Sequence, residues 1–344
     1  MNNADRGFDK AVIVEGVRKT FGEVVALHEV SFEVNRGEVI GLLGPNGAGK
    51  TTIVDILSTL SRPDRGRAAV AGYDCVSEPA GVRRSIMLTG QQVAIDDMLT
   101  GHENLVMFGR LYGVSRSAAR SRATELIEEF DLVDAANRRV STYSGGMRRR
   151  IDIACGLVVR PQVAFLDEPT TGLDPRSRQS IWDLVSNFKT TGIATLLTTQ
   201  YLEEADELAD RIIVIDHGRI IAEGTANELK ERTGTSFCEI VPRALKDLPA
   251  IAEALGSLLP EKHRAALTAE SDRIAIPAPR GTRTLVEAVA HLAAANIEVA
   301  DLALRRPSLD DVFLALTQDP TTQDPTEVHT ELRNGNPSAA GVVS

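Results

Sequence analysis

The sequence predicts an α/β fold in which a large domain with a helix-covered parallel sheet precedes a small α+β domain. Between residues 10 and 230, short apolar runs rich in β-branched residues alternate with longer amphipathic patterns. This alternation is typical of parallel strands joined by helices. Near residue 234 the pattern changes to shorter units in the order βαββαβ, which is typical of a ferredoxin-like sandwich.

Four apolar runs are predicted to be buried strands of the large domain. They are short and rich in Val, Ile and Leu, which is the composition of parallel strands covered on both faces. Long amphipathic patterns lie between them, and one of these, residues 115–130, is predicted to be a helix. The four predicted strands are residues 39–43, 163–166, 193–197 and 212–215.

The small domain is expected to span residues 235–317. A final helix is predicted to begin at Ser308, because Pro307 precedes it and the apolar residues that follow share one face. Those apolar residues are Leu309, Val312, Phe313 and Leu316. The strands expected before this helix are residues 237–241, 265–267, 273–276 and 297–304, and the helices are 245–259 and 282–295.

The two ends of the chain are expected to be less ordered. Residues 1–10 are predicted to be a flexible N-terminus, followed by the large domain at 11–234. Residues 318–344 are rich in Pro, Thr, Asp, Asn and Gly, and they are predicted to be a disordered tail.

Composition restricts the classes of function. The 344 residues carry a formal net charge of −10, which argues against broad nucleic-acid binding because that requires a basic surface. The three cysteines have no zinc-ligand spacing and are expected to be reduced thiols. No signal peptide is expected, and the longest uncharged stretch, residues 190–202, is shorter than the roughly 20 residues of a membrane span. If the protein acts at a membrane, it is expected to do so through a partner protein.

A glycine-rich loop follows the first predicted strand and precedes a helix expected at residues 52–60. It matches the phosphate-loop pattern, in which backbone N–H groups converge on the β-phosphate of a nucleotide. Lys50 is expected to lie between the β- and γ-phosphates, Thr51 to bind magnesium, and Thr52 to donate to phosphate. A glycine-rich turn without a ligand is the alternative. The loop consists of Gly44, Pro45, Asn46, Gly47, Ala48, Gly49, Lys50 and Thr51.

A second candidate site lies where an apolar run ends in two acids. Residues 163–166 are followed directly by Asp167 and Glu168. Acids at a buried strand end are costly without a cation, so a cationic partner is expected. Asp167 is predicted to hold the magnesium shell, and Glu168 to orient the attacking water as general base. Considered alone, the two acids also suit a solvated turn.

The segment Tyr143-Ser144-Gly145-Gly146-Met147 lies between these two motifs. Taken alone, Ser-Gly-Gly is most often a turn. In this order, however, the chain resembles the nucleotide-binding domain of ABC proteins over about residues 11–234. The resemblance implies a RecA-like core with a helical subdomain, and ATP with Mg²⁺ as ligands.

The same resemblance implies further roles for single residues. Ser144, Gly145 and Gly146 would complete the ATP site of a second copy, so that two chains pair head-to-tail around two ATPs. Asp174 looks like the D-loop acid at the seam of that homodimer. Phe21 would stack on adenine, although by itself Phe21 is more typical of a core residue. Gln91 looks like the magnesium-linked residue that meets the permease, with Gln92 as a neighbour that confuses the register.

A narrower match covers nearly the whole chain and resembles the ATP-binding subunits of the daunorubicin/doxorubicin-resistance family, with the mycobacterial member looking closest. It implies a separate integral membrane permease and a peripheral position on the cytoplasmic face of the cell membrane. It also implies export of a hydrophobic drug, or of a complex lipid such as phthiocerol dimycocerosate. The segments that carry it are residues 89–91, 99–101, 143–150, 198–201 and 308–314.

Two positions depart from the general ABC pattern. Gln200 stands where most ABC ATPases have a switch histidine, and a glutamine can hydrogen-bond the γ-phosphate but cannot carry a proton's charge. Met147 replaces a glutamine and loses a polar contact. The arginines at 148–150 are expected to form a solvated or ion-paired face, with a phosphate or permease contact as the alternative.

Other functions stay open from the sequence. They are a non-transport ABC ATPase acting on nucleic acid or ribosomes, an importer motor, and a protein that binds ATP without hydrolysing it. The acidic composition and the single phosphate loop argue against the first.

Overall fold

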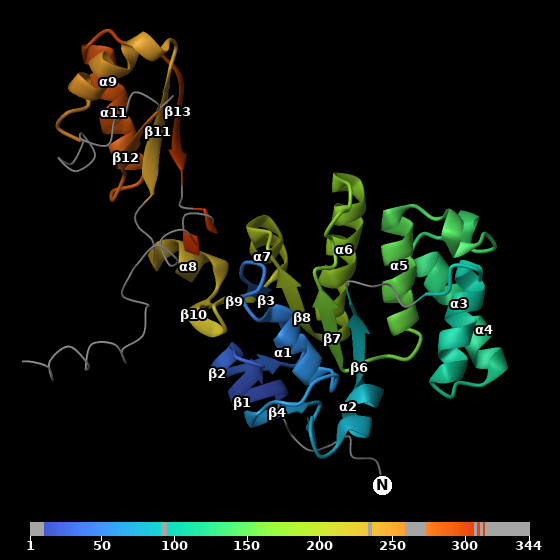
Figure 1. The fold of residues 1–344 in the computed structure, drawn as a ribbon. Coiled ribbons are helices and arrows are strands. Elements are labelled where there is room, and N and C mark those ends of the chain that lie inside the picture. The colour runs from blue at the N-terminus through green and yellow to red at the C-terminus, as the bar shows by residue number, and fades with distance from the viewer. Residues whose placement is uncertain are drawn as a thin grey trace, which may run out of the picture.

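The computed structural model describes residues 10–90, 95–232, 236–258, 273–305, 308–309 and 312–313. The chain opens with a four-stranded sheet in the order β2-β1-β4-β5 (Figure 1). Every neighbouring pair in it is antiparallel. Its strands are β1 (Lys10–Phe21), β2 (Val24–Asn35), β4 (Arg65–Val70) and β5 (Tyr73–Asp74).

The central sheet has six strands in the order β10-β9-β3-β8-β7-β6. All neighbours are parallel except β10, which returns antiparallel beside β9. The prediction of a parallel sheet is therefore confirmed. The strands are β3 (Val39–Leu43), β6 (Ile86–Thr89), β7 (Val163–Asp167), β8 (Ala194–Thr199), β9 (Arg211–Asp216) and β10 (Arg219–Gly224).

The two faces of this sheet pack into different hydrophobic clusters, and β7 shows how. Val163 and Phe165 belong to the cluster that contains α1 (Lys50–Leu57) and the antiparallel sheet. Ala164 and Leu166 belong to a second cluster, which contains residues of the helices between positions 101 and 191. Because strand side chains alternate between faces, Asp167 falls on the α1 face. The end of β7 therefore meets the start of α1 on this face of the sheet.

The helices of the large domain lie beside and around this sheet. Figure 1 shows α3, α4 and α5 grouped to one side, with α6 between that group and the strands. The predicted helix at 115–130 is α4, and Ser115 caps it by accepting from the Ala118 N–H. The helices are α2 (Pro79–Ser85), α3 (Gly101–Leu111), α4 (Arg116–Glu129), α5 (Gly145–Gly156), α6 (Pro175–Thr191), α7 (Leu202–Leu208) and α8 (Ala226–Arg232).

Two predicted helices are longer than the observed ones. The helix after the phosphate loop ends at Leu57 rather than at residue 60, because Thr59 adopts a left-handed conformation with φ of 68°. In the small domain, the helix predicted at 245–259 is a short 3₁₀ turn at Leu245–Asp247 followed by α9 (Leu248–Ala254).

The small domain contains a three-stranded antiparallel sheet in the order β12-β11-β13. Three of the four predicted strands are observed, and the fourth, at 265–267, lies outside the described residues. The helix predicted at 282–295 is α11 (Thr282–Ala294). The strands are β11 (Phe237–Pro242), β12 (Ile274–Pro277) and β13 (Val299–Arg305).

After the small domain, the described part of the C-terminal segment packs on the large domain. Leu309 and Val312 are buried in one cluster with Leu43 of β3 and Ala205 of α7. Both residues lie on the face predicted from the sequence. Within the described ranges, no helix combines the length and apolar character that crossing a membrane requires. Of the predicted flexible N-terminus, residues 1–9 lie outside the described residues, whereas Lys10 begins β1. The predicted disordered tail, residues 318–344, lies outside the described residues.

Candidate active site

The phosphate loop connects β3 to α1 and holds Lys50 in a buried position. Lys50 is only 5% exposed. Its Nζ donates to the carbonyl oxygens of Gly44 (2.8 Å) and Pro45 (3.1 Å). The same nitrogen lies 3.6 Å from Oε1 of Glu168. Lys50 is therefore a cationic partner of Glu168, one of the two acids at the end of β7.

Two glycines of the loop cannot carry a side chain. A Cβ on Gly44 would lie 2.2 Å from the carbonyl oxygen of Ile215, and Gly49 has φ of +106° and would place a Cβ 2.8 Å from the Ala26 carbonyl oxygen. Gly49 is also the residue that precedes α1. The loop thus packs against β2 and β9 with backbone alone, which leaves its N–H side available to a ligand.

Asp167 and Thr51 meet at the start of α1, because Asp167 lies on the face of β7 that packs against this helix. Thr51 Oγ1 donates to Asp167 Oδ2 at 3.2 Å, and Thr198 at the end of β8 donates to the other carboxylate oxygen. Asp167 is buried. A hydroxyl beside a buried carboxylate forms a set of hard oxygen donors, which are the ligands that Mg²⁺ prefers. The residues present therefore fit a magnesium ion.

Glu168 occupies a strained backbone position directly after β7. Its φ of 46° lies in the left-handed region, which is uncommon for a residue other than glycine. Its N–H donates to the Thr198 carbonyl and to Thr198 Oγ1, both at 3.1 Å. Its Oε2 accepts from Thr171 Oγ1 at 3.3 Å. This conformation turns the carboxylate toward Lys50.

Gln200 follows β8 at the same edge of the sheet. β8 pairs with β7 so that Thr198 is opposite Asp167, which places Gln200 two residues beyond this pair. Gln200 is half-buried. The next residue, Tyr201, donates its N–H to Thr199 Oγ1 at 2.9 Å. The turn after β8 is therefore held by its own hydrogen bonds.

The Ser144 segment lies at the start of α5, away from the phosphate loop of the same chain. Ser144 and Gly145 are exposed, and Ser144 Oγ accepts from the Met147 N–H at 3.3 Å. Figure 1 shows α5 on the far side of α6 from α1. The structure thus brings Lys50, Thr51, Asp167 and Glu168 together and leaves the Ser144 segment apart from them.

Gly146 of α5 and Asp174 at the start of α6 both lie beside Ser177. A Cβ on Gly146 would lie 2.2 Å from Ser177 Oγ, so a glycine is required there for the two helices to approach. Asp174 caps α6, accepting from the Ser177 N–H (3.0 Å) and hydroxyl (2.6 Å). These two hydrogen bonds hold the pKa of Asp174 below its usual range.

Phe21 lies at the end of β1, and the interpretation of this residue as core is wrong. Its side chain is 52% exposed, because β1 ends there in a tight hairpin with β2 at Val24. The Lys19 ammonium lies 5.2 Å from the centre of the ring. Lys19 covers one face of the ring, and the exposed part of the side chain is available to a ligand. Gln91 and Gln92 lie outside the described residues.

Two buried charged residues were missed by the sequence-based interpretation. Arg149 was expected on a solvated or ion-paired face; it is ion-paired with Asp152, but it is buried, with only 7% of its surface exposed. Glu204 of α7 is 1% exposed, and burial raises its pKa. Helical spacing places Arg149 on the same side of α5 as the buried Ile153, which was the one available signal.

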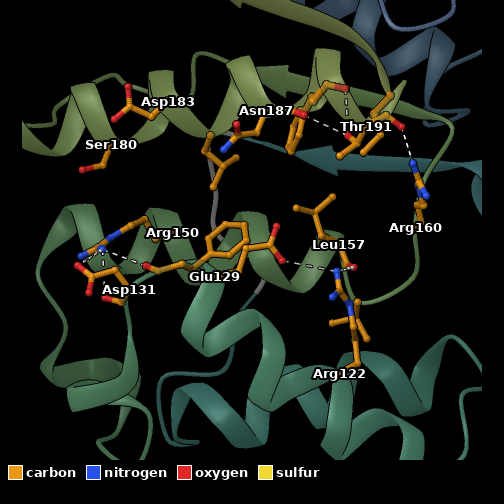
Figure 2. Close-up of a pocket in the computed structure, with 15 residues that line it drawn as sticks. Arg122, Glu129, Asp131, Arg150, Leu157, Arg160, Ser180, Asp183, Asn187 and Thr191 are labelled. Atoms are coloured by element: carbon orange, nitrogen blue, oxygen red, sulfur yellow. Dashed lines mark hydrogen bonds and ion pairs between the residues drawn. The ribbon is translucent and has the colours of Figure 1, made fainter.

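A cavity of about 690 Å³ lies between α4, α5 and α6, and none of the predicted site residues lines it. Figure 2 shows its arginines turned toward neighbouring oxygens. Arg150 pairs with Asp131, and Arg122 contacts Glu129 and the Leu157 carbonyl oxygen. The three arginines of the cavity are thus bound to neighbouring oxygens rather than directed at the open space.

The chain is similar to known ATP-binding proteins. A family model described as ABC transporter matches residues 27–171. The doxorubicin resistance ATP-binding protein DrrA of Mycobacterium tuberculosis is 75% identical over 318 residues, which are 92% of this chain and 96% of that protein. The daunorubicin/doxorubicin resistance ATP-binding protein DrrA of Streptomyces peucetius is 49% identical over 92% of this chain and 96% of that protein.

Solved structures resemble the large domain. A dimeric ATP-binding cassette in a post-hydrolysis state, bound to ADP and Pi, has a TM-score of 0.56 and 27% identity. The similarity covers 62% of this chain and 98% of that chain. Given this fold, the site at the end of β7 and relatives that match nearly the whole length, the chain belongs to the ABC transporter family as an ATP-binding protein of the daunorubicin/doxorubicin-resistance group.

Proposed function

We propose that this chain is the ATP-hydrolysing subunit of a xenobiotic-transporting exporter. Two copies pair head-to-tail at the cytoplasmic face of the membrane and drive a separate integral membrane permease. The cargo is a hydrophobic drug of the daunorubicin/doxorubicin type or a complex lipid of the phthiocerol dimycocerosate type. The convergence of Lys50, Thr51, Asp167 and Glu168 supports hydrolysis, and the names of the DrrA relatives support drug export.

The chemistry assigned to this site is attack of water on the γ-phosphorus of ATP, with ADP as the leaving group. Lys50 neutralises charge on the β- and γ-phosphates, and the loop N–H groups from Gly44 to Thr52 hold the β-phosphate. Glu168 orients the water and takes its proton. Gln200 donates a hydrogen bond to the γ-phosphate. Phe21, exposed at the end of β1, stacks on adenine.

Magnesium is assigned to the oxygens at the start of α1. Thr51 Oγ1 and the Asp167 carboxylate are already within hydrogen-bond distance of each other, so both face one point. Gln91 is the third assigned contact. Magnesium bound there would neutralise the negative charge of the phosphate oxygens.

The position of α5 supports the proposed homodimer. Ser144 and Gly145 are exposed at the beginning of a helix of 12 residues, and helix N-termini bind phosphate groups through free N–H donors. Because α5 is separated from the phosphate loop of its own chain, a second copy is needed to bring Ser144, Gly145 and Gly146 to the γ-phosphate. Asp174 then lies near the seam.

Hydrolysis is tested by Glu168→Gln in the full chain. We expect kcat to fall by on the order of 100-fold or more, with ATP binding and ATP-dependent dimerisation retained, because only the base is lost. Glu207→Gln changes an exposed acid of α7 and serves as the matched control, with an unchanged rate. Equal turnover in wild type and Glu168→Gln would remove Glu168 as the base.

Export is tested by purifying the tagged chain from its native host, with and without ATP. An integral membrane protein should co-purify, and cells carrying wild-type chain should accumulate less doxorubicin than cells carrying Glu168→Gln. Accumulation that does not depend on Glu168 would exclude this drug as cargo. Recovery of only ribosomal or nucleic-acid-bound proteins would replace the transporter with a non-transport ATPase.

A further inference from the structure

Three consecutive arginines at the start of α5 have different environments. Arg148 is partly exposed and pairs with Asp97, and Arg150 is partly exposed and pairs with Asp131. Arg149, between them, is buried. All three residues are arginines on the same helix, so the difference in their burial arises from the face of the helix on which each lies and from what its side chain contacts.

Arg149 donates to main-chain oxygens on both sides of Glu168. Its Nε donates to the Pro169 carbonyl oxygen at 2.9 Å, and one terminal nitrogen, Nη2, donates to the Asp167 carbonyl oxygen at 3.2 Å. Its other terminal nitrogen, Nη1, donates to the Gly90 carbonyl oxygen at 3.0 Å. One side chain therefore holds the peptide groups that flank Glu168 and the one that precedes Gln91.

The ionic surroundings of Arg149 allow a buried charge in this place. Nη1 also lies 3.2 Å from Asp152 Oδ2. Burial lowers the pKa of the guanidinium, and the charges of Asp152, Asp167 and Glu204 oppose that shift. Only a planar guanidinium presents enough fixed donors to satisfy three carbonyl oxygens and a carboxylate at once. A lysine could carry the charge but could not make all of these bonds.

The position of Glu168 requires such support. Its left-handed backbone is strained, and strained residues keep their conformation only where the surrounding structure fixes them. β7 and Thr198 hold the peptide from the sheet side, and Arg149 holds it from the α5 side. Loss of the second support would let the carboxylate relax away from the attacking water.

We propose that Arg149 is a positioning residue for catalysis, holding the Glu168 segment in its strained conformation through the Asp167 and Pro169 carbonyl groups. This inference rests on the proposed role of Glu168 as the base. Arg149 touches none of the phosphate-loop residues through the contacts described here, so its effect is on the rate of hydrolysis rather than on the binding of ATP.

The experiment compares Arg149→Lys with Arg148→Lys and Arg150→Lys in the full chain. We expect Arg149→Lys to lower kcat about tenfold or more, since small misplacements of a reacting group have effects of this size. KM for ATP should stay within about threefold and the ATP-dependent dimer should still form, because the phosphate loop is untouched. The two control variants keep the wild-type rate.

A second variant tests whether the loss of kcat could instead come from misfolding caused by an unpaired buried charge. Arg149→Gln with Asp152→Asn removes both members of the buried ion pair together, so the net charge stays the same and neither of the two is left as an unpaired ion. We expect the same loss of kcat with ATP-dependent dimerisation retained. A kcat within twofold of wild type in either variant, or a KM that rises in proportion to the loss of kcat/KM, would overturn the positioning role. If instead Glu168→Gln keeps wild-type turnover, the proposed function itself fails, whatever Arg149 does.

Discussion

The phosphate loop and the buried charges behind Glu168 are built in opposite ways. In the loop, residues 44–52, the functional groups are consecutive, and Lys50 contacts carbonyl groups only five and six residues away. The second region, here called the buried-charge layer, consists of Arg149, Asp152, Thr170, Trp182 and Glu204. Its contacts join residues from α5, α6, α7 and the segment after β7. The loop depends on local geometry, whereas the layer depends on how helices pack.

Glu204 shows the electrostatic difference between the two regions. Its Oε1 accepts from Thr170 Oγ1 at 2.8 Å and from Trp182 Nε1 at 3.3 Å. Its Oε2 has no hydrogen-bond partner among the described residues. In the loop, by contrast, the buried Lys50 is matched by Glu168 and two carbonyl groups. The layer therefore holds an acid whose neutral form is favoured by burial.

The largest expected effect comes from adding one methyl group to the loop. Gly44→Ala forces a Cβ toward the Ile215 carbonyl oxygen, 2.2 Å away in the present geometry, so the loop backbone must shift. We expect ATP affinity to fall on the order of 100-fold, since losing hydrogen bonds to a charged phosphate group has effects of this size. Titration with a fluorescent ATP analogue measures it. Gly156→Ala is the control, because the nearest atoms to its methyl group, in the Met87 side chain, are 3.1 Å away or more, so the added group requires a much smaller shift than at Gly44. Unchanged ATP affinity in Gly44→Ala would show that ATP binding does not depend on the position of the loop backbone.

The same contrast explains how much the sequence could predict. The strands that were predicted, the loop and the acids of β7 were predictable because their spacing is set by strand and helix geometry, and these strands agree with the structure within two residues wherever it describes them. The antiparallel sheet β2-β1-β4-β5 was not predicted from the sequence. The burial of Arg149 was not predictable, because Arg148 and Arg150 beside it are the same residue type. Only tertiary packing supplies Arg149 with carbonyl partners 18 to 59 residues away. Phe21 looked like core because its exposure depends on where a hairpin ends.

The next largest effect is expected at Glu204. Glu204→Ala leaves the Thr170 hydroxyl and the Trp182 N–H without their acceptor, and we expect the free energy of unfolding to fall by about 2–4 kcal/mol. Glu204→Gln keeps an acceptor oxygen and should lose much less. Denaturant titration of both variants measures the difference. If the two substitutions were equally destabilising, the charge rather than the hydrogen bonds would be what the layer requires.

The pH dependence at Glu204 follows from the direction of its shift. Burial raises its folded pKa above the unfolded value, near 4.5, so the folded state binds the proton more tightly. The stability that this gives is fully present below the unfolded pKa and is lost as pH rises through the folded pKa. Wild type should therefore lose stability relative to Glu204→Gln as the pH is raised above 4.5. Denaturant titrations that show a constant difference across this range would contradict the shift.

The smallest effect is expected for Thr170→Val, which removes one hydroxyl from the layer without changing its shape. Thr170 is fully buried, and loss of its hydrogen bond to Glu204 should lower the free energy of unfolding by about 1 kcal/mol. Thr190→Val makes the same substitution on an exposed residue of α6 and should cost less. If the layer acts as a unit, Thr170→Val combined with Glu204→Ala should cost clearly less than the sum of the two, since the hydroxyl has no acceptor left to lose. Additive costs in denaturant titrations would mean that Thr170 and Glu204 stabilise the fold independently, and the layer would then be a set of separate contacts.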